Sequence, residues 1–311
     1  MDYVLNEMAD GSNERISLLG SMILGGDAQQ ILERLPDGCV RCIVTSPPYW
    51  GLRDYGIEGQ IGLEEFLRDF LGKLVAVFRE ARRVLSDDGT LWLNIGDGYT
   101  SGNRGWRAPD KKNPARAMSV RPDTPAGLKP KDLIGVPWRL AFALQADGWF
   151  LRSDIVWNKP NAMPESVKDR PTRSHEYLFL LSKREQYFYN GNVVMEDRED
   201  GQGKRNRRTV WSVNTEPFRD AHFATFPPAL IEPCILAGSN PGDYVLDPFF
   251  GSGTVGVVCD SLRRNFIGIE LHPDYLTLAA RRIDAAKASH AHQHPKARSS
   301  SRLRRKLNTA A

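Results

Sequence analysis

The chain has 311 residues, of which 41% are hydrophobic and 26% charged, so it can bury one large core with a small inserted subdomain. No apolar run approaches the length of a membrane span, and the acidic N-terminus lacks the features of a secretory signal. These features exclude the membrane and secreted classes and make the cytoplasm the expected location.

Apolar runs alternate with helical spacings along the chain. After an N-terminal segment without a clear pattern, the predicted strands are 21–27, 40–44, 90–95, 150–157, 176–181, 244–246 and 265–269. The predicted helices are 28–35, 63–85, 136–147, 229–237, 253–261 and 273–287. This order predicts an α/β fold with a Rossmann-like, mostly parallel seven-stranded sheet and helices on both faces.

Basic segments lie outside this alternation. Residues 96–137 and 199–220 are irregular and rich in Lys and Arg, and such long stretches inside a domain are usually functional. From Lys287 onward there are seven Lys or Arg and no acid, so removing these seven from the formal charge of +4 leaves about −3 for the body. We predict one domain over 1–285 with two insertions, followed by a flexible basic tail over 286–311.

The four cysteines include one C-x-x-C, formed by Cys39 and Cys42, which alone could indicate zinc or redox chemistry. The pair lies in a predicted strand, where side chains at i and i+3 point to opposite faces. No second Cys or His pair at metal spacing accompanies it. We therefore interpret the cysteines as buried, reduced thiols and expect no metal site.

A glycine-rich turn over 247–254, with the sequence DPFFGSGT, lies between a predicted strand and a predicted helix. Glycines there let the backbone turn tightly and approach a ligand closely. Glu270 stands seventeen residues beyond Gly253, where an acid can accept hydrogen bonds from both ribose hydroxyls of a nucleoside cofactor. A dinucleotide oxidoreductase has a similar turn, but no second nucleotide-binding half follows this one. A tight turn without a ligand is the other alternative.

These motifs resemble those of S-adenosylmethionine-dependent DNA amino-methyltransferases. Phe249-x-Gly251-x-Gly253 resembles their motif I, 267–270 resembles motif II, and 222–227 resembles motif X. With the S-P-P-Y of 46–49 the resemblance covers most of the chain, and it implies the β group, in which the catalytic motif precedes the cofactor motif. It implies that S-adenosylmethionine is bound by Asp27, Phe223, Phe226, Asp247, Phe249, Gly251, Gly253, Thr254 and Glu270.

The loop formed by Ser46, Pro47, Pro48 and Tyr49 suits methyl transfer to an exocyclic amino group. Such a nitrogen is a poor nucleophile because its lone pair is delocalised into the ring. By analogy with the family, the Ser46 hydroxyl and the Pro47 carbonyl would accept its hydrogens and favour a pyramidal nitrogen. The prolines stiffen the loop, and Tyr49 would stack on a flipped base, so neither a metal nor a covalent intermediate is required. A plain Pro-rich turn is the alternative.

The target base is the most finely balanced expectation. In the family, Asp at the position of Ser46 usually marks adenine N6 enzymes, while Ser is frequent among cytosine N4 enzymes. The whole-chain layout resembles solitary β-group enzymes, many of which act on adenine. The resemblance therefore prefers adenine N6 slightly and keeps cytosine N4 nearly level with it.

Double-stranded DNA is the expected partner, because Lys and Arg in the irregular segments can neutralise phosphates or read guanine. A solvated loop is the alternative for any one of them. The candidates for DNA contact are Arg104, Arg107, Arg121, Asn158, Lys159, Arg205, Arg207 and Arg208.

The β-group resemblance implies a homodimer. A cognate restriction endonuclease and association with the nucleoid are further expectations. Two other functions compete with DNA methylation. One is an RNA or protein-glutamine methyltransferase, against which the motif order and Ser46 count. The other is a catalytically inactive DNA-binding protein of the same fold.

Overall fold

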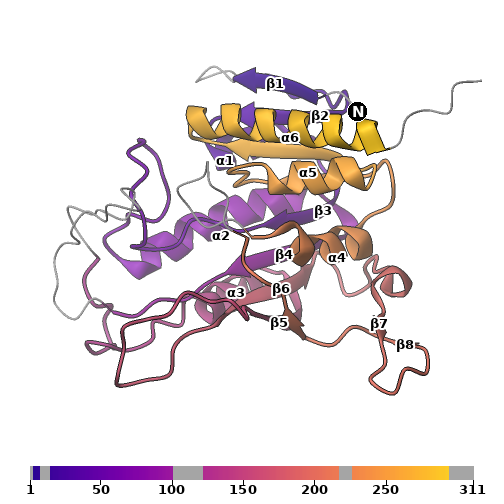
Figure 1. Ribbon diagram of the computed structural model, residues 1–311. Coiled ribbons are helices and arrows are strands. Elements are labelled where there is room, and N and C mark those ends of the chain that lie inside the picture. Colours follow the sequence, from indigo (N-terminus) through magenta and orange to yellow (C-terminus); the bar gives the residue numbers. More distant parts are fainter. Residues whose placement is uncertain (1–2, 8–14, 101–121, 217–225, 294–311) are drawn as a thin grey trace, which may run out of the picture.

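The computed structural model describes residues 3–7, 15–100, 122–216 and 226–293. Within these residues the centre of the molecule is a nine-stranded sheet with the order β1-β2-β11-β10-β3-β4-β6-β5-β9 (Figure 1). Its strands are β1 (Tyr3–Glu7), β2 (Ser21–Gly25), β3 (Val40–Thr45), β4 (Leu85–Ile95), β5 (Phe150–Asn158), β6 (His175–Ser182), β9 (Val210–Ser212), β10 (Tyr244–Asp247) and β11 (Asn265–Glu270). Of these described strands, β6 alone runs antiparallel to its neighbours. A separate antiparallel hairpin pairs β7 (Glu196–Asp197) with β8 (Lys204–Arg205).

Helices cover both faces of the sheet (Figure 1). The described helices are α1 (Ala28–Arg34), α2 (Leu67–Val84), α3 (Val136–Ala146), α4 (Pro228–Gly238), α5 (Thr254–Ser261), α6 (Pro273–Gln293) and the 3-10 turn η2 (Gly191–Val194). Side chains of α1, α2 and α3 pack in one core cluster, and those of α4, α5 and α6 in a second. The two clusters lie on opposite faces of the sheet, because successive side chains of β3 point to opposite faces: Ile43 belongs to the first cluster and Val44 to the second.

The seven predicted strands form the centre of the sheet, and the prediction of seven strands is corrected to nine. The additional strands, β1 and β9, lie at the two edges. Strand β9 has three residues and is defined by its register with β5, in which Trp211 pairs with Trp157, so no local alternation could have indicated it. The segment from 199 to 220 is accordingly not irregular throughout.

Three boundaries differ from the prediction by four residues or more. Helix α2 begins at Leu67 because the backbone of Phe66, at the N-cap, is extended, and Phe66 itself is 46% exposed. Strand β4 begins at Leu85 and not at Thr90, because Leu85 already pairs with Val40 of β3, ahead of the register shift between Val40 and Cys42. Helix α6 continues to Gln293, beyond the expected end near Lys287 and into the predicted tail. Residues 294–311 of that tail lie outside the described part.

The sheet brings two distant segments together. Strand β10 pairs in parallel with β3, where Val245 faces Cys42 and Leu246 faces Ile43. The loop after β3 and the turn after β10 therefore leave the same edge of the sheet side by side, although about 200 residues separate them. The carboxyl edge of such a sheet is where ligands bind in α/β folds.

None of the helices in the described ranges is long and apolar enough to span a membrane. The cysteines are free, and burial raises the pKa of the Cys42 thiol to about 12 and that of Cys39 to about 11. These thiols are therefore protonated at neutral pH. Among the described residues, no group of His, Cys, Asp and Glu side chains could hold a metal ion.

Candidate active site

A cavity of about 840 Å³ opens at the carboxyl edge of the sheet, between the loop after β3 and the turn after β10. Most of the site residues predicted from the sequence meet there. Those that line it are Asp27, Ser46, Pro47, Pro48, Tyr49, Lys159, Phe226, Asp247, Phe249, Gly251, Thr254 and Glu270.

The glycine-rich turn depends on two glycines with left-handed backbones. Gly251 has φ +52° and Gly253 has φ +76°, a region that side chains with a Cβ rarely adopt. A Cβ added to Gly253 would also lie 2.9 Å from the Cβ of Ala279 on α6. The turn closes through a bond from the Gly253 amide to the Phe250 carbonyl at 2.9 Å. The sequence prediction of a tight turn between strand and helix is confirmed.

Glu270 lines the cavity from the end of β11. Its carboxylate accepts hydrogen bonds from the amides of Gly251, at 2.7 Å, and His272, at 2.8 Å, and burial raises its pKa. Each oxygen keeps a further lone pair for a hydroxyl of a ligand. Tyr55 and Tyr275, which the sequence did not indicate, line the same cavity as Glu270. Their rings pack edge to face with 6.1 Å between the ring centres.

Asp247 joins the two halves of the site. Its Oδ1 accepts a 2.6 Å hydrogen bond from the Thr45 hydroxyl, at the end of β3, and a 3.1 Å bond from the Phe249 amide. Burial raises the pKa of Asp247 to about 7, and the nearby charge of Glu270 contributes in the same direction. Two carboxyls that line the cavity, the buried one of Asp247 and the half-buried one of Glu270, suit a ligand that carries positive charge and hydroxyl groups.

Tyr49, in the loop after β3, is fixed by a network centred on Glu176, which was not among the predicted site residues. The Tyr49 hydroxyl donates to Glu176 Oε2 at 2.9 Å, and Asn94 Nδ2 donates to the same oxygen at 3.2 Å. Lys159 Nζ lies 2.5 Å from Glu176 Oε1. Burial and then the Glu176 charge raise the pKa of Tyr49 well above its usual value. The phenol is therefore protonated and acts as a donor.

Other predicted cofactor residues have structural contacts as well. Asp27 caps helix α1 by accepting from the Gln30 amide at 3.0 Å, which leaves its second oxygen unassigned. Thr254 is buried, and its hydroxyl accepts from Arg282 at 2.8 Å. Phe226 is buried at the wall of the cavity, whereas Phe223 lies outside the described residues.

The predicted DNA contacts divide into two groups. Asn158 is the last residue of β5, where its Nδ2 donates to the Ser212 hydroxyl at 3.0 Å, and Lys159 follows it and lines the cavity. Arg205, Arg207 and Arg208 come before β9, which runs parallel to β5, so they lie toward the opposite end of the sheet from the cavity. Residues Arg104, Arg107 and Arg121 fall outside the described ranges.

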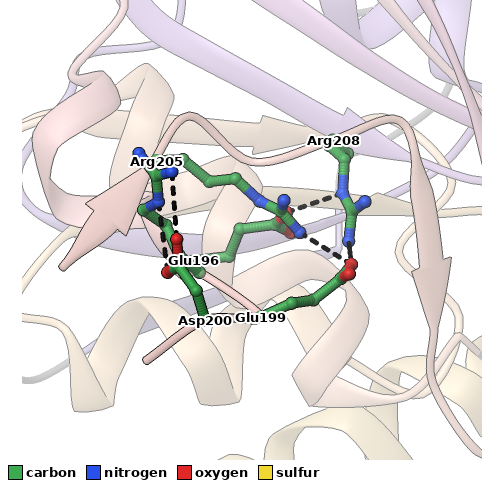
Figure 2. A network of polar contacts seen from close by, with 6 residues as sticks. Glu196, Glu199, Asp200, Arg205 and Arg208 are labelled. Atoms are coloured by element: carbon green, nitrogen blue, oxygen red, sulfur yellow. Dashed lines mark hydrogen bonds and ion pairs between the residues drawn. The ribbon is translucent and has the colours of Figure 1, made fainter. Parts of the chain in front are cut away.

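The cations of that opposite end are engaged within the protein. Arg205 and Arg208 each donate to Glu196 Oε1 at 2.9 Å and also bind Glu199, at 3.3 and 3.0 Å (Figure 2). The guanidinium carbon of Arg207 lies 4.4 Å from the centre of the Trp211 ring. None of these three arginines lines the cavity.

Comparison with known proteins agrees with this geometry. The model of the DNA methylase family of N6/N4 methyltransferases matches residues 40–281. Type II methyltransferase M.Cfr9I of Citrobacter freundii is 71% identical over 87% of this chain and 90% of its own length. Type II methyltransferase M.SmaI of Serratia marcescens is 61% identical over 86% of this chain and 92% of its own.

Solved structures share the fold. The DNA modification methylase TTHA0409 from Thermus thermophilus, in complex with S-adenosyl-L-methionine, matches with a TM-score of 0.60 and 26% identity over 86% of this chain and 94% of its own. The cytosine-N4-specific PvuII DNA methyltransferase matches with a TM-score of 0.64 and 19% identity over 89% and 93%. This chain therefore belongs to the N6/N4 family of DNA methylases and is an S-adenosylmethionine-dependent DNA amino-methyltransferase.

Proposed function

We propose that this enzyme holds a base, flipped out of the duplex, against Ser46, Pro47, Pro48 and Tyr49 and methylates its exocyclic amino nitrogen. The observation that carries this proposal is the shared cavity: the catalytic loop after β3 and the carboxyl-bearing turn after β10 line the same space. A base and a cofactor placed there would be in contact, and alignment of two reactants supplies a large part of a transfer rate.

The residues at one end of the cavity fit S-adenosylmethionine. Glu270 would bind the ribose hydroxyls, and Asp247 would face the positively charged portion of the cofactor. Burial makes the ionised form of Asp247 costly, and a nearby positive charge would offset that cost. Phe249 and Gly251 line the same cavity. When bound, the cofactor supplies an electrophilic methyl group. The residues of this chain would orient the nucleophile and exclude water.

At the other end, the loop supplies acceptors for the amino hydrogens. Ser46 and Pro47 line the cavity directly after β3, and two consecutive prolines limit the freedom of the loop. Acceptors that are fixed before the substrate arrives need no reorganisation when charge develops on the nitrogen. This preorganisation favours a nitrogen whose lone pair points at the methyl group.

Labelled S-adenosylmethionine and duplex genomic DNA provide the test. We expect the DNA to become labelled. We also expect mass spectrometry of the digested deoxynucleosides to detect N6-methyldeoxyadenosine or N4-methyldeoxycytidine. The identity of that product decides between the two bases, of which the sequence prefers adenine only slightly. A protein that binds the cofactor and DNA but labels no genomic DNA would contradict the proposal and favour an inactive DNA-binding protein.

Specificity and partners are further parts of the proposal. The relatives named above are Type II methyltransferases, which supports a site-specific enzyme accompanied by a cognate restriction endonuclease, acting on DNA in the cytoplasm and on the nucleoid. Sequencing of methylated positions in DNA from cells that express this chain would identify the recognition site. Sedimentation of the purified protein, alone and with a duplex, would test the homodimer. Equal label transfer to RNA or to a protein would favour the competing methyltransferase classes.

A further inference from the structure

A half-buried carboxylate, that of Glu176, lies beside the catalytic loop without an assigned role. Glu176 is the second residue of β6, and its partner across β5 is Trp157. Because β6 runs antiparallel to β4 and β5, its beginning lies at the same edge as the ends of those strands. This direction places the Glu176 side chain at the wall of the cavity.

Three donors from three segments converge on this carboxylate. Lys159 Nζ lies 2.5 Å from one oxygen, and the Tyr49 hydroxyl and Asn94 Nδ2 donate to the other at 2.9 and 3.2 Å. The side chains of Glu176 and Lys159 are only 17% and 16% exposed. Hydrogen bonds to a charged group in such surroundings are stronger than those in water, so this arrangement is stiff.

The partners of Glu176 are themselves held in place. Asn94 is 2% exposed and also donates to the Tyr177 carbonyl at 3.0 Å, so its side chain is held in one position. The Lys159 ammonium lies 4.1 Å from the centre of the Trp157 ring. The carboxylate is therefore anchored independently of the catalytic loop.

The Tyr49 ring fits closely between the loop and strand β4. A Cβ added to Gly96, just after β4, would lie 2.7 Å from Tyr49 Cε2 and 3.2 Å from the Glu176 side chain. The absence of a side chain at Gly96 lets the ring approach the backbone, while the bond to Glu176 fixes the hydroxyl. Together these contacts define both the position and the tilt of the ring.

We propose that Glu176, anchored by Lys159 and Asn94, is a positioning residue that holds the Tyr49 ring at the angle required to stack on the flipped base. This inference rests on the proposed function, because it assigns a purpose to the bond between Glu176 and the loop that receives the base. Preorganising a contact surface in this way reduces the ordering cost of substrate binding.

A double-mutant cycle with Tyr49→Phe and Glu176→Gln tests this role. Tyr49→Phe keeps the stacking ring and removes only the hydroxyl. Glu176→Gln keeps the shape but presents an amide donor to Lys159 or Asn94. We expect each change to lower kcat by about 10- to 100-fold, since misplacement of reacting groups by about 1 Å can cost 100-fold. Glu176→Gln should cost at least about fivefold less in the Tyr49→Phe background, because its target is already absent.

Separate measurements exclude a general structural effect. The dissociation constant for S-adenosylmethionine and the Tm should stay close to those of the unchanged protein in each variant. Glu80→Gln is a matched control, because the Glu80 side chain is 23% exposed and paired with Arg83 on α2, away from the cavity. We expect Glu80→Gln to leave kcat within about twofold of the unchanged protein. Glu176→Asp, whose side chain is shorter by one methylene, should recover little of the kcat lost in Glu176→Gln.

The outcomes separate this inference from the proposed function. Full activity of Glu176→Gln, with Ser46→Ala inactive, would overturn the inference alone. Additive losses in the cycle would also overturn it, since Glu176 would then act through another group than the Tyr49 hydroxyl. Full activity of Ser46→Ala would overturn the proposed catalytic loop, and the positioning role of Glu176 with it.

Discussion

Carboxyl groups in two regions of this molecule respond to their surroundings in opposite ways. In the cavity, burial raises the pKa of Asp247 to about 7 and also raises that of Glu270. In the exposed β7–β8 hairpin, hydrogen bonds from Arg208 and then Arg205 lower the pKa of Glu199. The buried carboxyls therefore gain most from a cationic ligand, whereas those of the hairpin are already neutralised within the protein.

The hairpin also shows that a run of cations in the sequence does not by itself present free charges on the surface. Arg205 and Arg208 stand in a run of cations but share the carboxylates of Glu196 and Glu199. A phosphate would have to displace those partners. Lys159 is also paired with a carboxylate, that of Glu176, but it lines the cavity. Location relative to the sheet, and not local charge density, separates the two regions.

The largest effects are expected from two substitutions in the cavity, one that lowers the rate of methyl transfer and one that weakens cofactor binding. Ser46→Ala should lower kcat by about 100- to 1000-fold, because it removes the proposed acceptor for a hydrogen of the reacting amino group, and should leave the Kd for S-adenosylmethionine nearly unchanged. Glu270→Gln should instead raise that Kd by about 10-fold or more, because it weakens the contact with the ribose hydroxyls. Single-turnover assays and calorimetry measure the two. An unchanged cofactor Kd in Glu270→Gln would contradict the assignment.

A smaller effect is expected from pH. The folded pKa of Asp247, about 7, lies above its ordinary value of 3.8, so protonation stabilises the fold. That contribution is complete below about pH 4 and is lost as the pH rises through about 7. The Tm of the cofactor-free protein should therefore fall by several degrees between about pH 5 and pH 8, and Asp247→Asn should reduce the fall. Thermal unfolding across this range is the measurement.

The hairpin provides the opposite sign as a control for that experiment. Glu199 has a lowered pKa in the folded protein. Its contribution to stability is therefore present above its ordinary pKa and is lost as the pH falls through the folded pKa. Glu199→Gln should consequently leave the Tm profile between about pH 5 and pH 8 parallel to that of the unchanged protein. If Asp247→Asn and Glu199→Gln altered the profile alike, the contrast between the two regions would be wrong.

The smallest effect is expected in the hairpin itself. Glu196→Gln combined with Glu199→Gln should leave the Tm within about 2 °C, because exposed ion pairs contribute little and are screened by salt. The same variant frees Arg205 and Arg208 from their partners. If the hairpin is remote from DNA, the affinity for a duplex at physiological salt should stay within about twofold. A marked gain in affinity, lost at high salt, would instead place the hairpin against the phosphates.

Local sequence accounted for much of the fold and for the two principal loops. Strand and helix periods predicted the seven central strands, and the positions of Gly251, Gly253 and Glu270 predicted a turn and an acid at neighbouring strand ends. Such features depend on residues close together in the chain. The edge strand β9 was missed because its three residues gain their conformation from pairing with β5.

The amino-acid sequence by itself determined that the loop of Ser46 to Tyr49 and the turn after Asp247 would each leave a parallel strand at its carboxyl end. Only the tertiary structure decided that β10 lies beside β3, which joins the two in one cavity. It also decided that Glu176, at the start of an antiparallel strand, would reach Tyr49, and that Arg205 would be bound by Glu196. The reason is physical: local spacing sets the direction of a side chain, but strand order and register set its neighbours.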